Sequence, residues 1–88
     1  MKITLNFAGI NTPAAAQEYL ARALAFPDYY GKNLDALYDM LTEWDRGGTF
    51  ALRFPADPAP EMAAYLPRLR RVFRDAAAAN PRLRVQDR

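Results

Sequence analysis

The sequence predicts a two-layer α/β domain: a three-stranded parallel sheet in the order 1-2-3 with helices packed on one face. Three short segments alternate apolar and polar residues, which is the period of a strand with one buried face. The segments that join them are far longer than hairpins and have helical spacing, so parallel strands joined by helical crossovers are expected. With helices on one face, right-handed crossovers arrange the strands in sequence order.

The three expected strands each bury one side. They cover residues 2–7, 49–54 and 82–86, and their apolar positions are Ile3, Leu5, Phe7, Phe50, Leu52, Phe54, Leu83 and Val85. None of the three is hydrophobic on both faces, so one face of the sheet stays bare. We expect that face to show Lys2, Arg53, Arg82 and Arg84.

Two helices are expected between the first and second strands. Thr12 can cap the first helix with Pro13 at its first position, and Phe26-Pro27 stops it. Asn33 can cap the second helix, which Gly47-Gly48 is expected to end. This second helix carries Leu34, Leu37, Leu41 and Trp44 at helical spacing.

Two more helices are expected before the last strand. A proline-rich turn over residues 57–60 precedes a short helix at 62–65, which Pro67 interrupts or restarts. The fourth helix follows it. Its buried residues are expected to be Leu69, Val72, Phe73 and Ala76.

Length and composition predict a single domain over residues 1–88 and exclude most enzyme chemistries. The chain is 51% hydrophobic and has neither cysteine nor histidine. Disulfides, thiol nucleophiles, imidazole bases and the commonest zinc ligands are therefore absent. The amino terminus is too short and polar for a signal peptide, and no apolar run reaches membrane-spanning length. We expect a cytoplasmic protein that is not an enzyme and uses no cofactor or metal.

Charge is distributed unevenly along the chain. Residues 28–45, here called the acidic segment, hold five carboxylates against Lys32, a charge of −4. Because the net charge of the chain is +2, the remaining residues carry +6. Most of that excess follows position 65, as Arg68, Arg70, Arg71, Arg74, Arg82, Arg84 and Arg88 against Asp75 and Asp87. Local fields, more than net charge, are expected to select partners.

Two carboxylates of the acidic segment stand four residues apart on the expected helix. Asp35 and Asp39 therefore share a face and repel each other. Asp35 also has a structural role open to it, because a carboxylate in the first helical turn is favoured by the helix dipole. Asp39 lies in mid-helix, where aspartate is a poor helix former. Asp39 is thus the stronger functional candidate.

Aromatic residues crowd the same stretch. One of Tyr29 and Tyr30 is expected to point inward, and Tyr38 is expected to be exposed beside the two aspartates. Trp44 has the spacing of the core positions and could be partly buried or exposed. Gly31 is expected to supply a positive φ or to let another backbone approach closely.

A paired-carboxylate face has three possible uses: general acid–base catalysis, binding of a divalent metal, and mimicry of a polyanion. Catalysis would need a pocket and a partner base, and magnesium binding would be expected to come with a phosphate-cradling glycine loop. A chain this small and without histidine offers little of a pocket or a partner base, and nothing in it resembles such a glycine loop. The third use is mimicry of a polyanion, in which carboxylates occupy the places of phosphates in a basic cleft.

The arginine-rich C-terminal half supports an alternative function, an RNA- or DNA-binding regulatory module. Arg68, Arg71 and Asp75 are expected on one helical face. A plain solvated face explains the same pattern, and Asp75 could pair with Arg71 or project toward the acidic segment. Spacing alone does not choose between these possibilities.

The run from Pro27 to Thr42, PDYYGKNLDALYDMLT, followed by Trp44, closely resembles the signature of the barstar family, intracellular inhibitors of the secreted ribonuclease barnase. The likeness spans about eighteen residues without a gap, and it extends more weakly to residues 72–76 and to the strand order. It implies inhibition in a 1:1 complex with a basic, extracellular-type ribonuclease, whose active site receives the second helix and its preceding loop.

The resemblance also assigns roles to residues. It implies that Asp39 takes the position of a substrate phosphate, that Asp35 contacts a second basic or guanine-site group, and that Tyr29 packs on a catalytic histidine. The rest of the implied binding surface consists of Gly31, Asn33, Leu34, Tyr38, Trp44, Val72 and the peripheral Asp75.

Three positions depart from the family pattern. Tyr38 stands where a well-known member has tryptophan, Lys32 where it has glutamate, and Ala79 where another acidic contact is expected. Each change makes the surface less acidic or less apolar. Barnase itself, a related microbial ribonuclease and another toxin with a basic cleft are all compatible targets.

Overall fold

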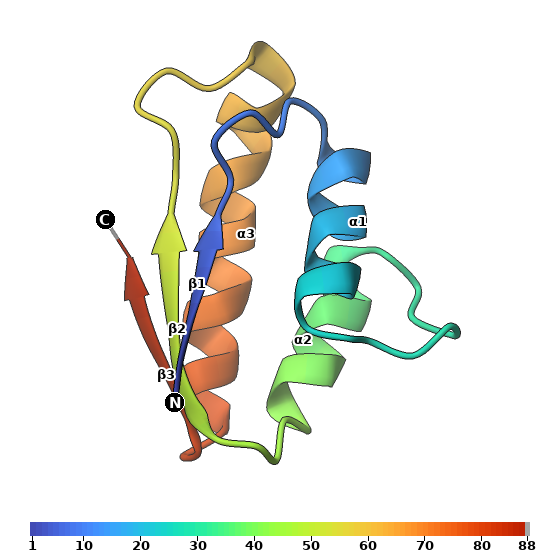
Figure 1. The fold of residues 1–88 in the computed structure, drawn as a ribbon, viewed down its shortest axis with the longest axis vertical. Helices are drawn as coiled ribbons and strands as arrows, with labels where there is room; N and C mark the ends of the chain where they lie inside the picture. The colour runs from blue at the N-terminus through green and yellow to red at the C-terminus, as the bar shows by residue number, and fades with distance from the viewer. Residues whose placement is uncertain (88) are drawn as a thin grey trace.

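The protein folds as three helices on one side of a small sheet (Figure 1). The computed structural model describes residues 1–87, and Arg88 lies outside the described residues. In chain order the elements are β1 (Lys2–Asn6), α1 (Pro13–Ala23), α2 (Leu34–Thr42), β2 (Gly48–Arg53), α3 (Pro60–Ala79) and β3 (Leu83–Asp87).

The sheet confirms the predicted class and strand order. All strand pairs are parallel, in the order β1-β2-β3. The register aligns Ile3, Phe50 and Val85 across the three strands on the covered face, and Lys2, Thr49 and Arg84 on the other. On the face without helices, Lys2, Arg53 and Arg84 are exposed, as the alternation predicts.

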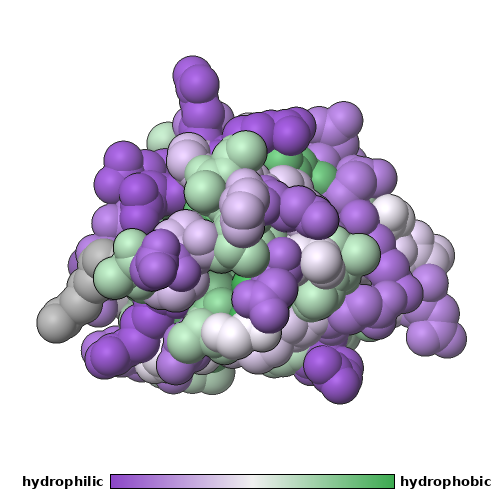
Figure 2. Space-filling model, turned by 90° about the horizontal axis from the view of Figure 1, so that it is seen from above, coloured by the Kyte–Doolittle hydropathy of each residue, from purple (hydrophilic) through white to green (hydrophobic). Residues whose placement is uncertain are grey.

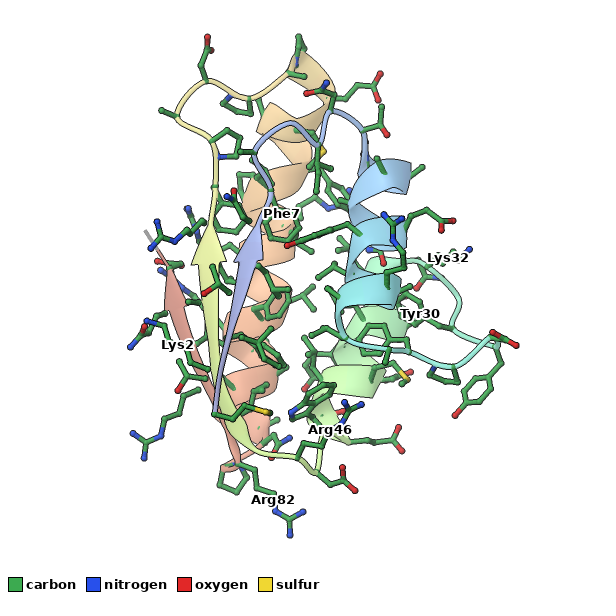
Figure 3. The ribbon with its side chains drawn as sticks, in the orientation of Figure 1. Lys2, Phe7, Tyr30, Lys32, Arg46 and Arg82 are labelled. Carbon is green, nitrogen blue, oxygen red and sulfur yellow. The ribbon has the colours of Figure 1, made fainter. Side chains whose placement is uncertain are left out.

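The core lies between the sheet and the helices. Phe50 of the central strand packs edge-on against Trp44 at 5.2 Å and against Phe73 of α3 at 5.9 Å between ring centroids. A second aromatic group forms around Phe7, whose ring contacts Tyr19 of α1 and Phe54. Figure 3 shows Phe7 between the sheet and the helices. The helices are therefore fixed to the sheet mainly by large apolar side chains.

The expectation of two helices around Pro67 is wrong, because α3 runs without a break from Pro60 to Ala79. Pro67 is exposed, so its ring faces solvent. A proline removes one backbone hydrogen bond of a helix, at a cost of about 3 kcal/mol. Burial of one continuous stripe outweighs that cost, since each large apolar side chain contributes about 1.5–3 kcal/mol. The stripe consists of Met62, Leu66, Leu69, Phe73 and Ala76.

The expected end of the second helix is also wrong. α2 ends at Thr42, so Trp44 lies beyond the helix rather than on its face. Gly47 and Gly48 lie instead at the start of β2, with φ values of 70° and 104°. A side chain at Gly48 would place its Cβ 2.7 Å from the carbonyl oxygen of Met1. The glycine pair thus allows β2 to begin beside the amino terminus.

The end of the molecule where α3 begins is mostly polar. Figure 2 looks onto this end and shows hydrophilic residues with smaller apolar areas among them.

Within residues 1–87, no helix is both long and apolar enough to cross a membrane.

Candidate functional site

The acidic segment folds as a loop, the helix α2 and a turn. Asn33 caps α2 as predicted, because its Oδ1 accepts a hydrogen bond of 2.7 Å from the backbone N–H of Ala36. Its Nδ2 donates to the carbonyl oxygen of Gly31 at 3.3 Å. One side chain therefore ties the loop to the first turn of the helix.

The expected positive φ falls on Lys32, not on Gly31. Lys32 has a φ of 55°, whereas the φ of Gly31 is not positive. Space explains the glycine better, since a Cβ on Gly31 would lie 3.3 Å from Nδ2 of Asn33 and 3.4 Å from Cβ of Ala36. Gly31 thus lets the loop fold closely over the start of α2.

The two tyrosines of the loop point in opposite directions, as predicted. Tyr29 is 84% exposed, while Tyr30 is buried. Figure 3 shows Tyr30 in the loop that follows α1, with Lys32 nearby. The ring of Tyr30 packs against Phe26 at a centroid distance of 4.6 Å. The buried tyrosine anchors the loop and leaves its neighbour on the surface.

The carboxylates of α2 face solvent. Asp35 and Asp39 of α2 are exposed, as is Glu43 directly after the helix, and none of the three forms an ion pair within residues 1–87. By contrast, the carboxylates of Glu18 and Asp87 are both paired with cations. The acidic face of α2 therefore keeps its negative charge available to a partner.

A surface depression of about 280 Å³ lies beside Asp39. Its lining consists of Tyr29, Tyr30, Gly31, Ala36, Asp39, Met40 and Glu43. Two carboxylates and an aromatic ring around a shallow hollow suit a cationic side chain, which can pair with the acids and stack on the ring. This depression joins residues of the loop and of α2 that the sequence separates by up to fourteen positions.

A larger cleft, of about 460 Å³, lies at the other end of α2. Asn33, Leu34 and Asp35 form one side, and Lys32, Tyr65 and Arg68 also line it. Lys32 Nζ lies 2.7 Å from Oε1 of Glu18 on α1. The hydrogen bond and charge of Lys32 lower the pKa of Glu18 below its usual range, and both side chains are half-exposed. The edge of the acidic face near Asp35 therefore contains positive charge.

Tyr38 and Trp44 have different environments. Tyr38 is 36% exposed beside the aspartates, as expected. Trp44 is only 5% exposed, and its Nε1 donates to the carbonyl oxygen of Gly47 at 3.1 Å. The guanidinium of Arg46 stacks over its ring at 4.2 Å. In this structure Trp44 is a residue of the core. Its contact with a partner stays a prediction.

The remaining expected contacts come from α3, which packs against α2. Val72 is half-buried there, and Asp75 is exposed. Asp75 forms no ion pair with Arg71 within residues 1–87. Two other arginines of α3 are engaged internally, because Arg70 Nε and Arg74 Nη2 lie 3.1 and 3.0 Å from Oδ2 of Asp87. That pairing leaves less positive charge free on α3 than the sequence suggests.

Two polar residues near the site escaped the sequence reasoning. Gln17 of α1 is buried and bonded to Tyr30, and Asn80 is buried against the turn after α2. For Gln17 a signal existed, since it lies on the same helical face as the apolar residues Ala16, Leu20 and Leu24. Asn80 carried no such signal, because an asparagine before a proline also fits a plain helix end. Among residues 1–87, no cluster of three or more acidic side chains is arranged to hold a metal ion.

Comparison with known proteins identifies the family of this chain. The family described as "Barstar (barnase inhibitor)" matches residues 1–86. This chain belongs to the barstar family. A Bacillus subtilis (strain 168) protein named "Putative ribonuclease inhibitor YrdF" is 76% identical over 21 residues, which cover 24% of this chain and 23% of that protein. The chain thus matches about a quarter of the length of that relative.

Proposed function

We propose that this protein is a non-enzymatic inhibitor of a barnase-type ribonuclease, which it blocks in a 1:1 complex by placing α2 and the preceding loop over the active site. Asp39 takes the place of a substrate phosphate in the basic cleft of the enzyme. The inhibitor acts in the cytoplasm and protects the producing cell from enzyme that remains inside it. Family membership and the name of the relative support the inhibitory role.

The observation that carries this proposal is the exposed, unpaired set of carboxylates on α2. Asp35 and Asp39 lie four residues apart, so their Cβ atoms are about 6 Å apart on one face. Neither has an ion pair within the described residues to neutralise it. A basic nuclease supplies the missing cations, and opposed fields also accelerate the encounter of the two proteins.

The depression beside Asp39 explains how the contact could be specific. A cationic side chain that enters it meets Asp39 and Glu43 while the exposed ring of Tyr29 covers it. Charge-assisted hydrogen bonds in a desolvated contact are stronger than neutral ones. Removing one partner of such a buried pair costs about 3–5 kcal/mol, a loss of affinity of more than about 100-fold.

The test is a titration of barnase activity with the wild-type protein and with Asp39→Ala. The wild type is expected to inhibit at one equivalent, and the variant is expected to bind at least about 100-fold more weakly. Asp57→Ala is a matched control, because Asp57 is an exposed carboxylate in the loop between β2 and α3. Equal inhibition by Asp39→Ala and the wild type would refute the mechanism.

The RNA- or DNA-binding alternative is tested in parallel. A pull-down with a guanyl-specific ribonuclease and a filter-binding assay on RNA use the same protein at the same ionic strength, because both interactions weaken with salt. Capture of the nuclease with little RNA retention is the expected result. Tight RNA binding without nuclease capture would favour the alternative.

A further inference from the structure

The structure buries two polar side chains among residues 1–87, apart from tyrosine and tryptophan, and each touches one end of the acidic segment. Gln17 is 3% exposed and Asn80 is 5% exposed. Gln17 contacts the loop that leads into α2, and Asn80 contacts the turn that leaves it. Neither residue lies in the acidic segment itself.

Gln17 joins three elements through its side-chain amide. Its Oε1 accepts a hydrogen bond from the hydroxyl of Tyr30, and its Nε2 donates to the hydroxyl of Tyr65 at 2.7 Å. The loop is thereby tied to α1 and, through Gln17, to α3. Burial, with a contribution from Tyr65, raises the pKa of Tyr30 above its usual value of 10.0, so its hydroxyl stays a donor to higher pH than that of an exposed tyrosine.

Tyr30 transmits this tie to the surface. It stands between Tyr29, whose ring is exposed, and Gly31, which folds against Asn33. Fixing the ring of Tyr30 therefore fixes the backbone that presents Tyr29 and leads into the cap of α2. Its backbone N–H also donates to the carbonyl oxygen of Pro27 at 2.9 Å, which closes the loop locally.

Asn80 fixes the other end in the same manner. Its Nδ2 donates to the carbonyl oxygens of Leu41 at 3.0 Å and of Trp44 at 2.9 Å. Its Oδ1 accepts from the backbone N–H of Arg82 at 3.0 Å. Carbonyls in the last turn of a helix lack intrahelical donors. The carbonyl oxygen of Leu41 accepts from the backbone N–H of Trp44 at 3.2 Å, and Asn80 adds a second donor to it. The turn after α2 is thus tied to the connection between α3 and β3.

Both amides use their donor and acceptor sides, so each admits one orientation. Apolar side chains of similar shape could fill these places with little net loss of stability, provided that their partners were also apolar. What hydrogen bonds add is a fixed direction between the segments they join. A binding surface that is already fixed loses less conformational entropy when it meets its partner.

We propose that Gln17 and Asn80 are positioning residues of the inhibitory surface, which hold the two ends of the acidic segment in the conformation that the nuclease binds. This inference rests on the proposed function. Neither side chain contacts the nuclease; Gln17 acts through Tyr30, and Asn80 acts through the carbonyl oxygens of Leu41 and Trp44.

The test compares variants that remove the ties with one that removes only core contacts. Gln17→Met and Asn80→Leu keep side-chain volume and lose the amides, and Tyr65→Phe removes one acceptor as a milder change. Val85→Ala is the matched control, because Val85 is a partly buried residue of β3, outside the acidic segment. All four are compared with the wild type at a temperature where urea titration shows them to be folded.

Two readouts are needed, affinity for barnase and hydrogen exchange of the free protein. Gln17→Met and Asn80→Leu are expected to bind about tenfold more weakly, through faster dissociation. Exchange is expected to rise for residues 28–33 in Gln17→Met and Tyr65→Phe, and for residues 41–46 in Asn80→Leu. Val85→Ala is expected to lower stability with unchanged affinity and no local increase in exchange.

The outcomes separate this inference from the proposed function. If the amide variants bind as Val85→Ala does, or if their exchange rises evenly over the chain, the two residues are ordinary structural residues. If the wild type inhibits neither barnase nor a second guanyl-specific ribonuclease, the proposed function is wrong, and hydrogen exchange alone decides whether the ties hold the acidic segment. Should Gln17→Met fail to fold, Tyr65→Phe provides the same comparison.

Discussion

Removing Asp39 is expected to stabilise the fold while it abolishes tight inhibition. Asp39 is exposed in the middle of α2 and has no ion pair within the described residues. Asp39→Ala relieves the repulsion with Asp35, about 0.2–0.5 kcal/mol, and replaces a poor helix former with a good one, up to about 0.7 kcal/mol. The free energy of unfolding should rise by about 0.5–1 kcal/mol, which raises Tm by about 2–8 °C.

Asp35→Ala is the matched comparison, and it should be nearly neutral. The same repulsion is relieved, but Asp35 lies in the first turn of α2. A carboxylate at that place interacts favourably with the helix dipole by about 0.3–1 kcal/mol, and the alanine loses this contribution. The two gains and the loss largely cancel. The two substitutions therefore differ in their effect on the free energy of unfolding, although the two aspartates share one face.

Urea unfolding at pH 7, at about 0.02 M and about 0.5 M salt, measures both effects. Salt screens exposed charges, so the part of the Asp39→Ala gain that comes from repulsion should shrink at the higher concentration. The helix-propensity part should remain. A lower free energy of unfolding for Asp39→Ala, or an equal gain for Asp35→Ala, would refute the reasoning that Asp39 destabilises the fold.

Two further predictions concern the framework. Pro67→Ala should raise the free energy of unfolding by about 2 kcal/mol. The continuous helix α3 regains one backbone hydrogen bond, and the greater entropy of the unfolded chain offsets part of that gain. A loss of stability in urea titration would mean that the proline shapes α3. Tyr30 has a raised pKa, so its contribution to stability is complete below about pH 10 and declines as the pH rises above that value. The difference in urea midpoint between wild type and Tyr30→Phe should therefore shrink between about pH 9 and pH 11, and a constant difference would contradict this linkage.

The sequence predicted the architecture because its signals are local. Alternation at Phe50 and Leu52 identifies a strand with one buried face, and the caps at Thr12 and Asn33 start α1 and α2 where the structure has them. The same local rules failed at Pro67, where propensity favours a break and burial of a long apolar stripe decides otherwise. They failed again after Thr42, because the position of Trp44 depends on its packing against Phe50 of β2 and on its hydrogen bond with Asn80, which is 36 positions away.

For the candidate site, the sequence by itself determined which groups are present and that the paired carboxylates are exposed, but not which of Tyr29 and Tyr30 is buried. The i, i+4 spacing of Asp35 and Asp39 places them on one face of any helix, and a polar, charged face turns to solvent. Tertiary structure decided which contacts fix the two ends of that helix and which charged residues border its acidic face. The contacts of Gln17 with Tyr30, of Lys32 with Glu18, and of Asn80 with Leu41 join segments up to 39 positions apart. Such contacts follow from how α1, α2 and α3 pack on the sheet, and no local pattern in the chain encodes that packing.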